Sequence, residues 1–243
     1  MTVSEFKNEF LIHYNAIASQ SAPGFDDYEI SVYLTKAQLE LVKNNYNPNG
    51  NKYKEGFENS EKRRTDLKEL ITSFTSTTII NSSLGISDKS TFFKIPNNVF
   101  LIIYENVLLE LPCDFKKVQV VPKTHDEVTS ELNNPFKRPS KNVVWRLDIS
   151  KIGVNQVVEL ISNFKIKDYT LRYLKYPKPI IISDLNLLYP GENLSIDGFS
   201  TSQSCELHQE LHREIIDRAV QIALRDYKPS NLESKIQLDT RNE

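Results

Sequence analysis

The spacing of apolar residues changes twice along this 243-residue chain, and that change limits the folds it can adopt. Over residues 1–75, and again from Ser204 to about Tyr227, apolar side chains recur every three or four residues, as on one face of a helix. Between these regions, runs of β-branched and aromatic residues are typical of strands. The pattern predicts an α+β fold, in which an N-terminal helical bundle is completed by a C-terminal helix and holds an inserted antiparallel β-rich region.

Three helices are expected in the first region. Thr2 and Glu5 have the spacing of a capping box, Asp26 and Glu29 start a second helix, and a third helix follows Ser60. The expected core faces are Val3, Phe6, Phe10, Tyr14 and Ile17; then Ile30, Tyr33, Leu34, Ala37, Leu41 and Val42; then Leu67, Leu70, Ile71 and Phe74.

The centre of the chain is expected to form strands. The candidate segments are residues 75–80, 91–95, 99–104, 107–111, 118–121, 143–149 and 157–161. A capping-box spacing at Thr124–Glu127 predicts a short helix that ends before the loop Asn133–Pro139. The expected domains are a bundle (1–75), a β-rich region (76–200), a C-terminal helix packed on the bundle (201–227) and a flexible tail (228–243).

The stretch Asp168–Ile182 is expected to bind another protein. Tyr169, Leu171 and Tyr173 alternate with more polar positions, which predicts a half-buried strand. Two prolines follow, and because proline cannot donate to a strand ladder they indicate either a sheet edge or an extended arm. The expected partner contacts in this stretch are Tyr173, Tyr176, Pro177 and Pro179.

Two basic clusters have alternative interpretations. Phe136, Lys137 and Arg138 lie between two prolines, so they form either an interface loop that binds a partner or a plain surface loop. Lys62–Arg64 could bind phosphate, but the acidic residues that follow favour a solvated helix face with ion pairs along the helix.

Catalytic and cofactor signatures are missing from the sequence. No Gly-x-Ser-x-Gly motif is present. The chain has only seven glycines, and this low count argues against a glycine-rich phosphate-binding loop. Cys205, His208 and His212 share one helix face, but Gln209 stands where a zinc protease needs glutamate. A fourth zinc ligand would have to come from far away, so hydrogen-bonded histidines are the simpler interpretation. We expect no enzyme activity, no metal and no cofactor.

The expected environment is intracellular and aqueous. Two cysteines form no disulfide framework, and no secretory leader is recognised, which favours folding in a reducing host cytoplasm. No apolar run nears the roughly 20 residues that span a bilayer, so no membrane partner is expected. The net charge of −2 gives no overall attraction to nucleic acid.

Several segments resemble a group of virion structural proteins from crAss-like bacteriophages. They are Phe6–Phe10, Tyr28–Gln38, Asn134–Pro139, Trp145–Leu147 and Tyr169–Pro179. The layout of helices around a β-rich insertion is also similar to that of head-tail connector (adaptor) proteins of short-tailed phages, and no catalytic signature accompanies the resemblance.

The resemblance implies a non-enzymatic homo-oligomeric ring of about a dozen copies in the virion neck. Its expected partners are further copies of itself, the portal protein at the portal vertex and neighbouring neck or tail ring proteins. DNA would pass through the channel without specific binding. The alternative is a phage nucleic-acid-binding or DNA-packaging accessory factor that uses Lys62–Arg64 and Lys137–Arg138, with Phe136 stacking on bases. A metal-dependent hydrolase using Cys205, His208 and His212 is the third and weakest possibility.

Overall fold

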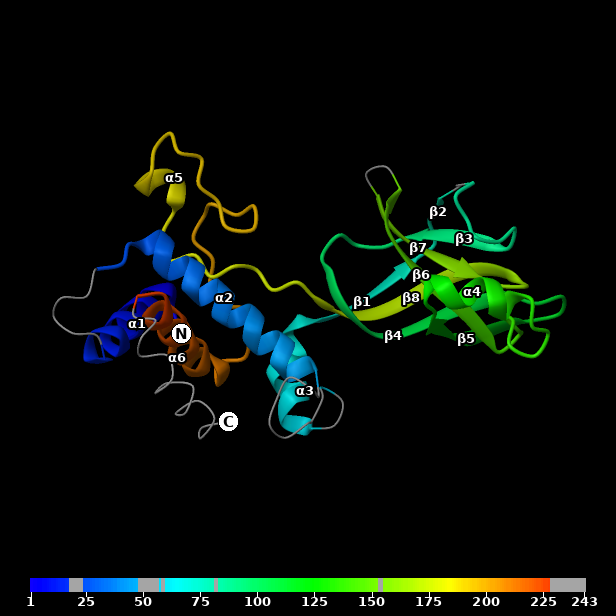
Figure 1. The fold of residues 1–243 in the computed structure, drawn as a ribbon, viewed down its shortest axis with the longest axis horizontal. Helices are drawn as coiled ribbons and strands as arrows, with labels where there is room; N and C mark the ends of the chain where they lie inside the picture. Colours follow the sequence, from blue (N-terminus) through cyan, green and yellow to red (C-terminus); the bar gives the residue numbers. More distant parts are fainter. Residues whose placement is uncertain (18–23, 48–56, 58–59, 81–82, 153–154, 228–243) are drawn as a thin grey trace. The chain divides into compact units, whose positions relative to one another are not determined.

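The computed structural model describes residues 1–17, 24–47, 57, 60–80, 83–152 and 155–227 (Figure 1). The chain divides into two compact units, Met1–Leu70 with Pro177–Glu243, and Ile71–Tyr176. The first carries helices and the second carries a sheet, so the mixed α+β class is confirmed. The tail predicted for residues 228–243 lies outside the described residues.

The helical unit buries its core between α1, α2 and α6. Its elements are α1 (Val3–Ile17), α2 (Asp27–Tyr46), α3 (Glu61–Leu67), the 3-10 turn η3 (Lys68–Leu70), α5 (Leu185–Leu188) and α6 (Leu211–Tyr227). α6 packs against both α1 and α2, and the three helices run side by side in Figure 1. Fully buried side chains of this core include Phe6, Phe10, Ile30, Leu34, Ile215 and Ala219.

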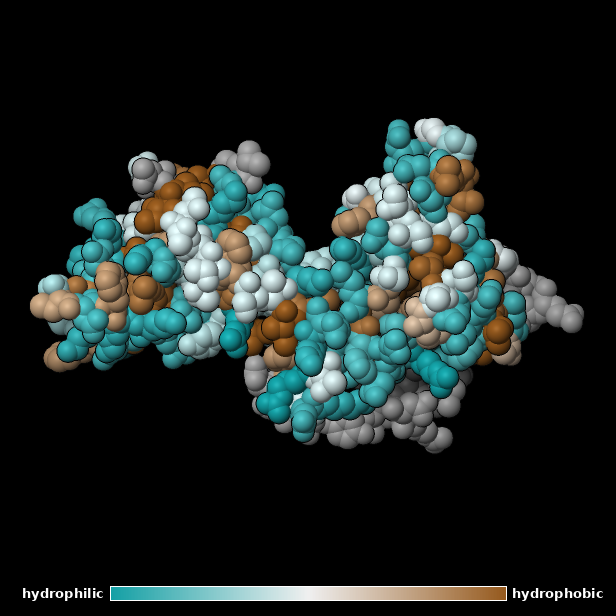
Figure 2. All heavy atoms as spheres, turned by 180° about the vertical axis from the view of Figure 1, so that it is seen from behind, coloured by the Kyte–Doolittle hydropathy of each residue, from teal (hydrophilic) through white to brown (hydrophobic). Residues whose placement is uncertain are grey.

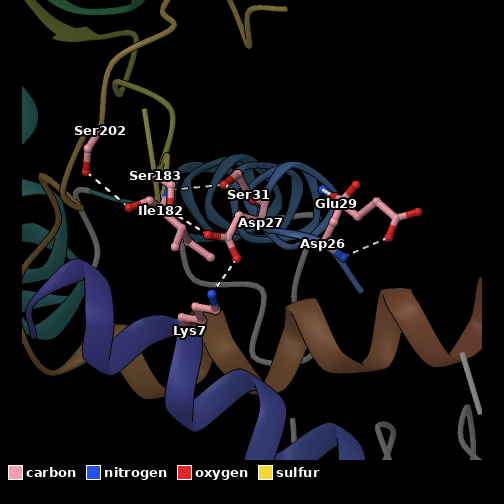
Figure 3. Close-up of polar contacts among 8 residues, drawn as sticks. All are labelled: Lys7, Asp26, Asp27, Glu29, Ser31, Ile182, Ser183 and Ser202. Atoms are coloured by element: carbon pink, nitrogen blue, oxygen red, sulfur yellow. Dashed lines mark hydrogen bonds and ion pairs between the residues drawn. The ribbon is translucent and has the colours of Figure 1, made fainter. Parts of the chain in front are cut away.

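The capping box predicted at Thr2–Glu5 is confirmed, and the predicted helix start at Asp26–Glu29 is a capping box as well. Asp26 accepts from the backbone N–H of Glu29 at 2.7 Å, and the Glu29 carboxylate accepts from the Asp26 N–H at 3.1 Å (Figure 3). At the start of α1, the Thr2 N–H donates to the Glu5 carboxylate at 2.7 Å. The backbone N–H of Glu5 donates in return to the Thr2 hydroxyl at 3.3 Å. Each pair satisfies end amides that have no partner within the helix.

Two helix boundaries differ from the prediction. The helix expected from Ser204 begins at Leu211, after a segment of bends and turns. The third helix ends at Leu67, and Ile71 and Phe74, which were expected on its core face, lie in strand β1. Phe74 packs against the core of the sheet. The residues 177–200, expected in the β-rich region, belong to the helical unit.

The second unit is one eight-stranded sheet in the order β1-β8-β4-β5-β6-β7-β3-β2. Its strands are β1 (Ile71–Ser76), β2 (Ile79–Ile80), β3 (Ser90–Lys94), β4 (Val99–Glu110), β5 (Phe115–Pro122), β6 (Val143–Ile152), β7 (Asn155–Ile161) and β8 (Lys165–Lys175). β5 and β6 are parallel and every other neighbouring pair is antiparallel, so the predicted antiparallel region contains one parallel pair. The crossover between the parallel strands contains α4 (His125–Leu132), as parallel pairs require.

The sheet curls so far that its two edges are joined by consecutive residues. β1 is one edge and β2 the other, and only Thr77 and Thr78 separate them in the chain. The inner core includes residues of β3 to β8, and the rings of Phe93 and Tyr169 lie 6.1 Å apart across it. α4 covers the other face, where Val128 packs on Trp145 and its neighbours.

Candidate subunit interface

The strand Lys165–Lys175 lies inside the sheet, between β1 and β4. The proposal of a sheet edge for this stretch is therefore wrong, while the alternative of an extended arm fits residues 177–182. The periodicity is confirmed, because Tyr169, Leu171 and Tyr173 are all buried in the sheet core. The edge assignment failed because the pairing partners of a strand lie far away in sequence.

The arm beyond the strand is held by polar side chains on one face of α2. The carbonyl of Lys178 accepts from Gln38 Nε2 at 2.9 Å. The backbone N–H of Ile180 donates to Thr35 Oγ1 at 3.2 Å. The N–H of Ile182 donates to Ser31 Oγ at 3.0 Å (Figure 3). These contacts occur at every second arm residue and at every third or fourth helix residue. The side chains on this helix face thus supply the hydrogen bonds that a neighbouring strand would otherwise supply to the arm.

The other side of the arm is paired as well. Ile181 exchanges two backbone hydrogen bonds of 3.0 Å with Gln203, and Ser202 Oγ donates to the Ile181 carbonyl at 3.1 Å. Ser183 donates to the Asp27 carboxylate, which also forms an ion pair of 2.7 Å with Lys7 (Figure 3). These partners lower the pKa of Asp27, against the effect of its burial. The arm is therefore a built-in part of the helical unit.

Thr35→Val should lower the free energy of unfolding of the helical unit by about 1–3 kcal/mol, because it leaves the buried N–H of Ile180 without a partner. Urea unfolding followed by circular dichroism measures the change. Thr65→Val is the matched control, since the Thr65 hydroxyl is exposed and bonds only within its own helix turn. Equal stability of both variants and the wild type would contradict a stabilising contribution from the hydrogen bond between Thr35 and Ile180.

Only one of the four arm and strand residues proposed as partner contacts is exposed. Tyr173 is 2% exposed, and its hydroxyl donates to Asn98 Oδ1 at 3.1 Å. Pro177 and Pro179 are buried as well. Tyr176 is 39% exposed, with its ring 5.3 Å from that of Phe100. Of this group, only Tyr176 has an exposed side chain.

The loop after α4 presents the most exposed large hydrophobic side chain of the described residues. Phe136 is 97% exposed, and Lys137 and Arg138 beside it are exposed too. The loop is nevertheless fixed: the N–H groups of Lys137 and Arg138 both donate to the Asn134 carbonyl at 3.1 Å. Asn163 donates to the carbonyl of the buried Pro139. Phe136 therefore projects from a braced loop, as an interface anchor would.

Two hollows flank this loop, which we call the α4 loop (residues 133–142). One of about 450 Å³ is lined by Phe136, Lys137, Arg138, Lys141 and Phe164, among others. The other, of about 350 Å³, is lined by Arg138, Pro139, Ile86 and Asp88, among others. Arg138 borders both, so the loop forms a ridge between two recesses.

A second projection, the α5 tip (residues 184–200), was not predicted. Leu187 is 81% exposed, Leu188 47% and Phe199 38%. Figure 2 shows hydrophobic side chains gathered over the part of the helical unit that carries α5. Beneath them, Leu185 and Ile196 are buried in a small core of their own. The sequence signal was the pair of leucines just before a Pro-Gly turn.

Local turns and a capping contact hold the α5 tip in place. Asp184 accepts from the Asn186 N–H at 3.0 Å and so caps α5. Ile196 and Phe199 exchange backbone hydrogen bonds of 2.9 Å around Asp197 and Gly198, whose positive φ angles (50° and 84°) fit a two-residue hairpin turn. A hydrogen bond to Asp26 raises the pKa of Tyr189 to about 12 and ties the tip to the start of α2.

His212 and Cys205, two of the three suspected metal residues, lie in largely buried surroundings. His212 is buried, and its Nε2 lies 3.0 Å from the Leu207 carbonyl. Burial raises the pKa of the Cys205 thiol to about 11, so it stays protonated at neutral pH. Across the residues that the structure describes, no group of three or more His, Cys, Asp or Glu side chains is arranged to hold a metal ion. None of the described helices is long and apolar enough to span a membrane.

Comparison with known proteins gives two full-length relatives, both from Bacteroides phage crAss001. "Ring protein 4/5" is 39% identical over 248 residues and covers all of both chains. "Ring protein 3" is 37% identical over 228 residues, covering 92% of this chain and 95% of the relative. The resemblance to crAss-like phage virion proteins is thereby confirmed. Residues 1–234 also match the family described as phage tail ring protein 3/4, and the chain belongs to that family.

Proposed function

We propose that the chain is a non-enzymatic virion protein that forms a closed ring in the phage neck, between the portal and the tail. The observation that carries the proposal is the pair of braced projections, the α4 loop and the α5 tip, which hold Phe136 and Leu187 in solvent. Large apolar side chains held rigidly in water indicate contact surfaces. Both relatives are named ring proteins, which supports a ring as the assembly that such surfaces would form.

The two projections lie in different units of the chain, so each copy offers two different surfaces. A ring needs two different surfaces on each copy, one for each neighbour. In this proposal α6 completes a bundle with α1 and α2, and this bundle supports the α5 tip. The expected partners are further copies, about a dozen in all, with the portal and adjacent ring proteins above and below.

The alternative of a nucleic-acid-binding or packaging factor has weaker support. Arg63, the middle residue of the cluster Lys62–Arg64, donates through Nη1 to the Asn44 carbonyl at 3.1 Å and so supports the fold. Lys137 lies 3.5 Å from Glu131 in an ion pair. Retention of the protein on DNA at physiological salt would favour this alternative.

Sedimentation velocity, with and without the portal protein of the same phage, tests the proposal. We expect a fast-sedimenting species of the chain whose amount rises with concentration, and its co-sedimentation with the portal protein. A chain that remains monomeric at every concentration, with the portal and without it, would contradict the proposal.

Phe136→Ser and Leu187→Ser should each weaken this assembly about tenfold or more, because each removes a buried anchor from the proposed interface. The shift of the concentration at half-assembly measures the effect. Ile12→Ser is the matched control, since Ile12 is 65% exposed on α1 and lies outside both projections. Equal loss in all three variants would contradict the assignment of the interface.

A further inference from the structure

The α5 tip carries only negative charge. No Lys or Arg occurs between Lys178 and Arg213, whereas Asp184, Glu192 and Asp197 all fall in the tip. Glu192 and Asp197 are exposed beside the exposed apolar side chains of the same tip. No described basic side chain forms an ion pair with either of them. The tip is thus an apolar surface with an unneutralised acidic rim.

The α4 loop has the opposite charge. No Asp or Glu occurs between Glu131 and Asp148, whereas Lys137, Arg138 and Lys141 all fall in the loop. Arg138 and Lys141 are exposed and have no ion-pair partner among the described carboxylates. Both line the larger hollow beside Phe136.

The two surfaces also differ in shape in a complementary way. The α5 tip projects, with Leu187 81% exposed at its end. The α4 loop borders recesses of about 450 and 350 Å³. Recesses in the range of about 300–1,000 Å³ can take up a few side chains or a small ligand. A projecting, acidic, apolar surface on one unit therefore matches a basic, aromatic ridge flanked by recesses on the other.

We propose that the α5 tip of one copy docks on the α4 loop of the next copy, with its leucines beside Phe136 and its acids facing Arg138 and Lys141. This inference rests on the proposed ring and names the contact that closes it. Such a contact uses different patches on the two copies, as a head-to-tail ring requires. The opposite charges would steer the encounter and exclude the reversed orientation.

A charge-swap experiment tests the contact. The first variant reverses the charge of the α4 loop (Arg138→Glu with Lys141→Glu). The second reverses the charge of the α5 tip (Glu192→Lys with Asp197→Lys). In each variant alone, every tip meets a loop of like charge, so assembly should weaken about tenfold or more. In an equimolar mixture, the wild-type tip of the first variant meets the wild-type loop of the second, and the two reversed surfaces also match. Assembly should therefore return in the mixture, as an alternating ring.

Two control variants distinguish loss of this contact from a general effect of charge reversal or of a damaged turn. Lys94→Glu with Lys151→Glu reverses two exposed lysines near the end of β6 and β7 remote from the α4 loop, and should leave assembly unchanged. Glu192→Lys alone keeps the Asp197 turn intact and should weaken assembly in the same direction. A melting curve for each variant verifies folding.

Three results would overturn the inference. Rings that form equally well in every variant would show that the contact lies elsewhere, while the proposed function would stand. Restoration only when all four reversals are placed in one chain, and not in the mixture, would mean that tip and loop meet within a single copy. Failure of the wild type itself to assemble would remove both the inference and the proposed function.

Discussion

Tyr173→Asp is expected to lower the free energy of unfolding of the β-rich unit by at least about 4 kcal/mol. Tyr173 is 2% exposed in β8, where it pairs with Thr72 of β1 and Ile102 of β4. The substitution removes a buried ring and places a carboxylate among the apolar side chains of the sheet core. Urea unfolding monitored by Trp145 fluorescence measures the loss, since Trp145 is the only tryptophan.

The neighbouring residue supplies the control. Arg172 is exposed and lies on the opposite face of the same strand. Arg172→Asp should cost no more than about 1 kcal/mol, the range of strand propensities. If Tyr173→Asp were as stable as Arg172→Asp, the assignment of the buried face of β8 would be wrong.

Arg146→Met is expected to lower the free energy of unfolding of the same unit by about 3–5 kcal/mol, because it leaves a buried carboxylate without its counter-charge. Arg146 forms an ion pair with Glu105 inside the curled sheet, and each residue is only 8% exposed. The Tyr169 hydroxyl donates to the same carboxylate at 2.7 Å. Without Arg146, Glu105 would keep this one hydrogen bond but lose its counter-charge. Urea unfolding at neutral pH measures the cost.

The pH dependence of this variant gives a second readout. Burial raises the pKa of Glu105 above its ordinary value of 4.5, and Arg146 opposes that rise. Removing Arg146 should raise the pKa further, so the folded state takes up a proton that the unfolded state releases. A group with a raised folded pKa stabilises the fold below its unfolded pKa and loses that contribution as pH rises through the folded pKa. The cost of Arg146→Met should therefore be smaller at about pH 4 than at pH 7.

Glu105→Gln combined with Arg146→Met should recover much of the lost stability, because no buried charge then remains unpaired. A cost of Arg146→Met that is equal at both pH values, and unchanged in the double variant, would contradict the buried pair.

The sequence predicted the local structure of each segment better than the pairing of strands in the sheet. The alternation in Tyr169–Tyr173 correctly gave the buried face of β8, because strand periodicity is a local property. The same residues could not show that β1 and β4 cover both sides of the strand. Ile71 and Phe74 are three residues apart, a spacing that suited a helix face, but pairing of β1 with β8 decided the outcome.

The candidate interface was predicted in part for similar reasons. The α4 loop was recognisable because Phe136 stands beside two cations between prolines. The α5 tip was missed because Leu185–Leu188 is typical of a core segment until the fold shows which leucines are covered. The arm that carries Pro177 and Pro179 is held by Ser31, Thr35 and Gln38, whose hydrogen bonds span about 140–150 residues of sequence and leave no local pattern.

Native mass spectrometry of the assembled protein tests the central claim most directly, because it counts the copies in each complex. A closed ring predicts one dominant oligomer of fixed copy number, which persists as the protein concentration rises. A ladder of ever larger oligomers would mean that the contact does not close. A two-fold dimer, or a monomer at every concentration, would contradict the account of this chain as a ring subunit.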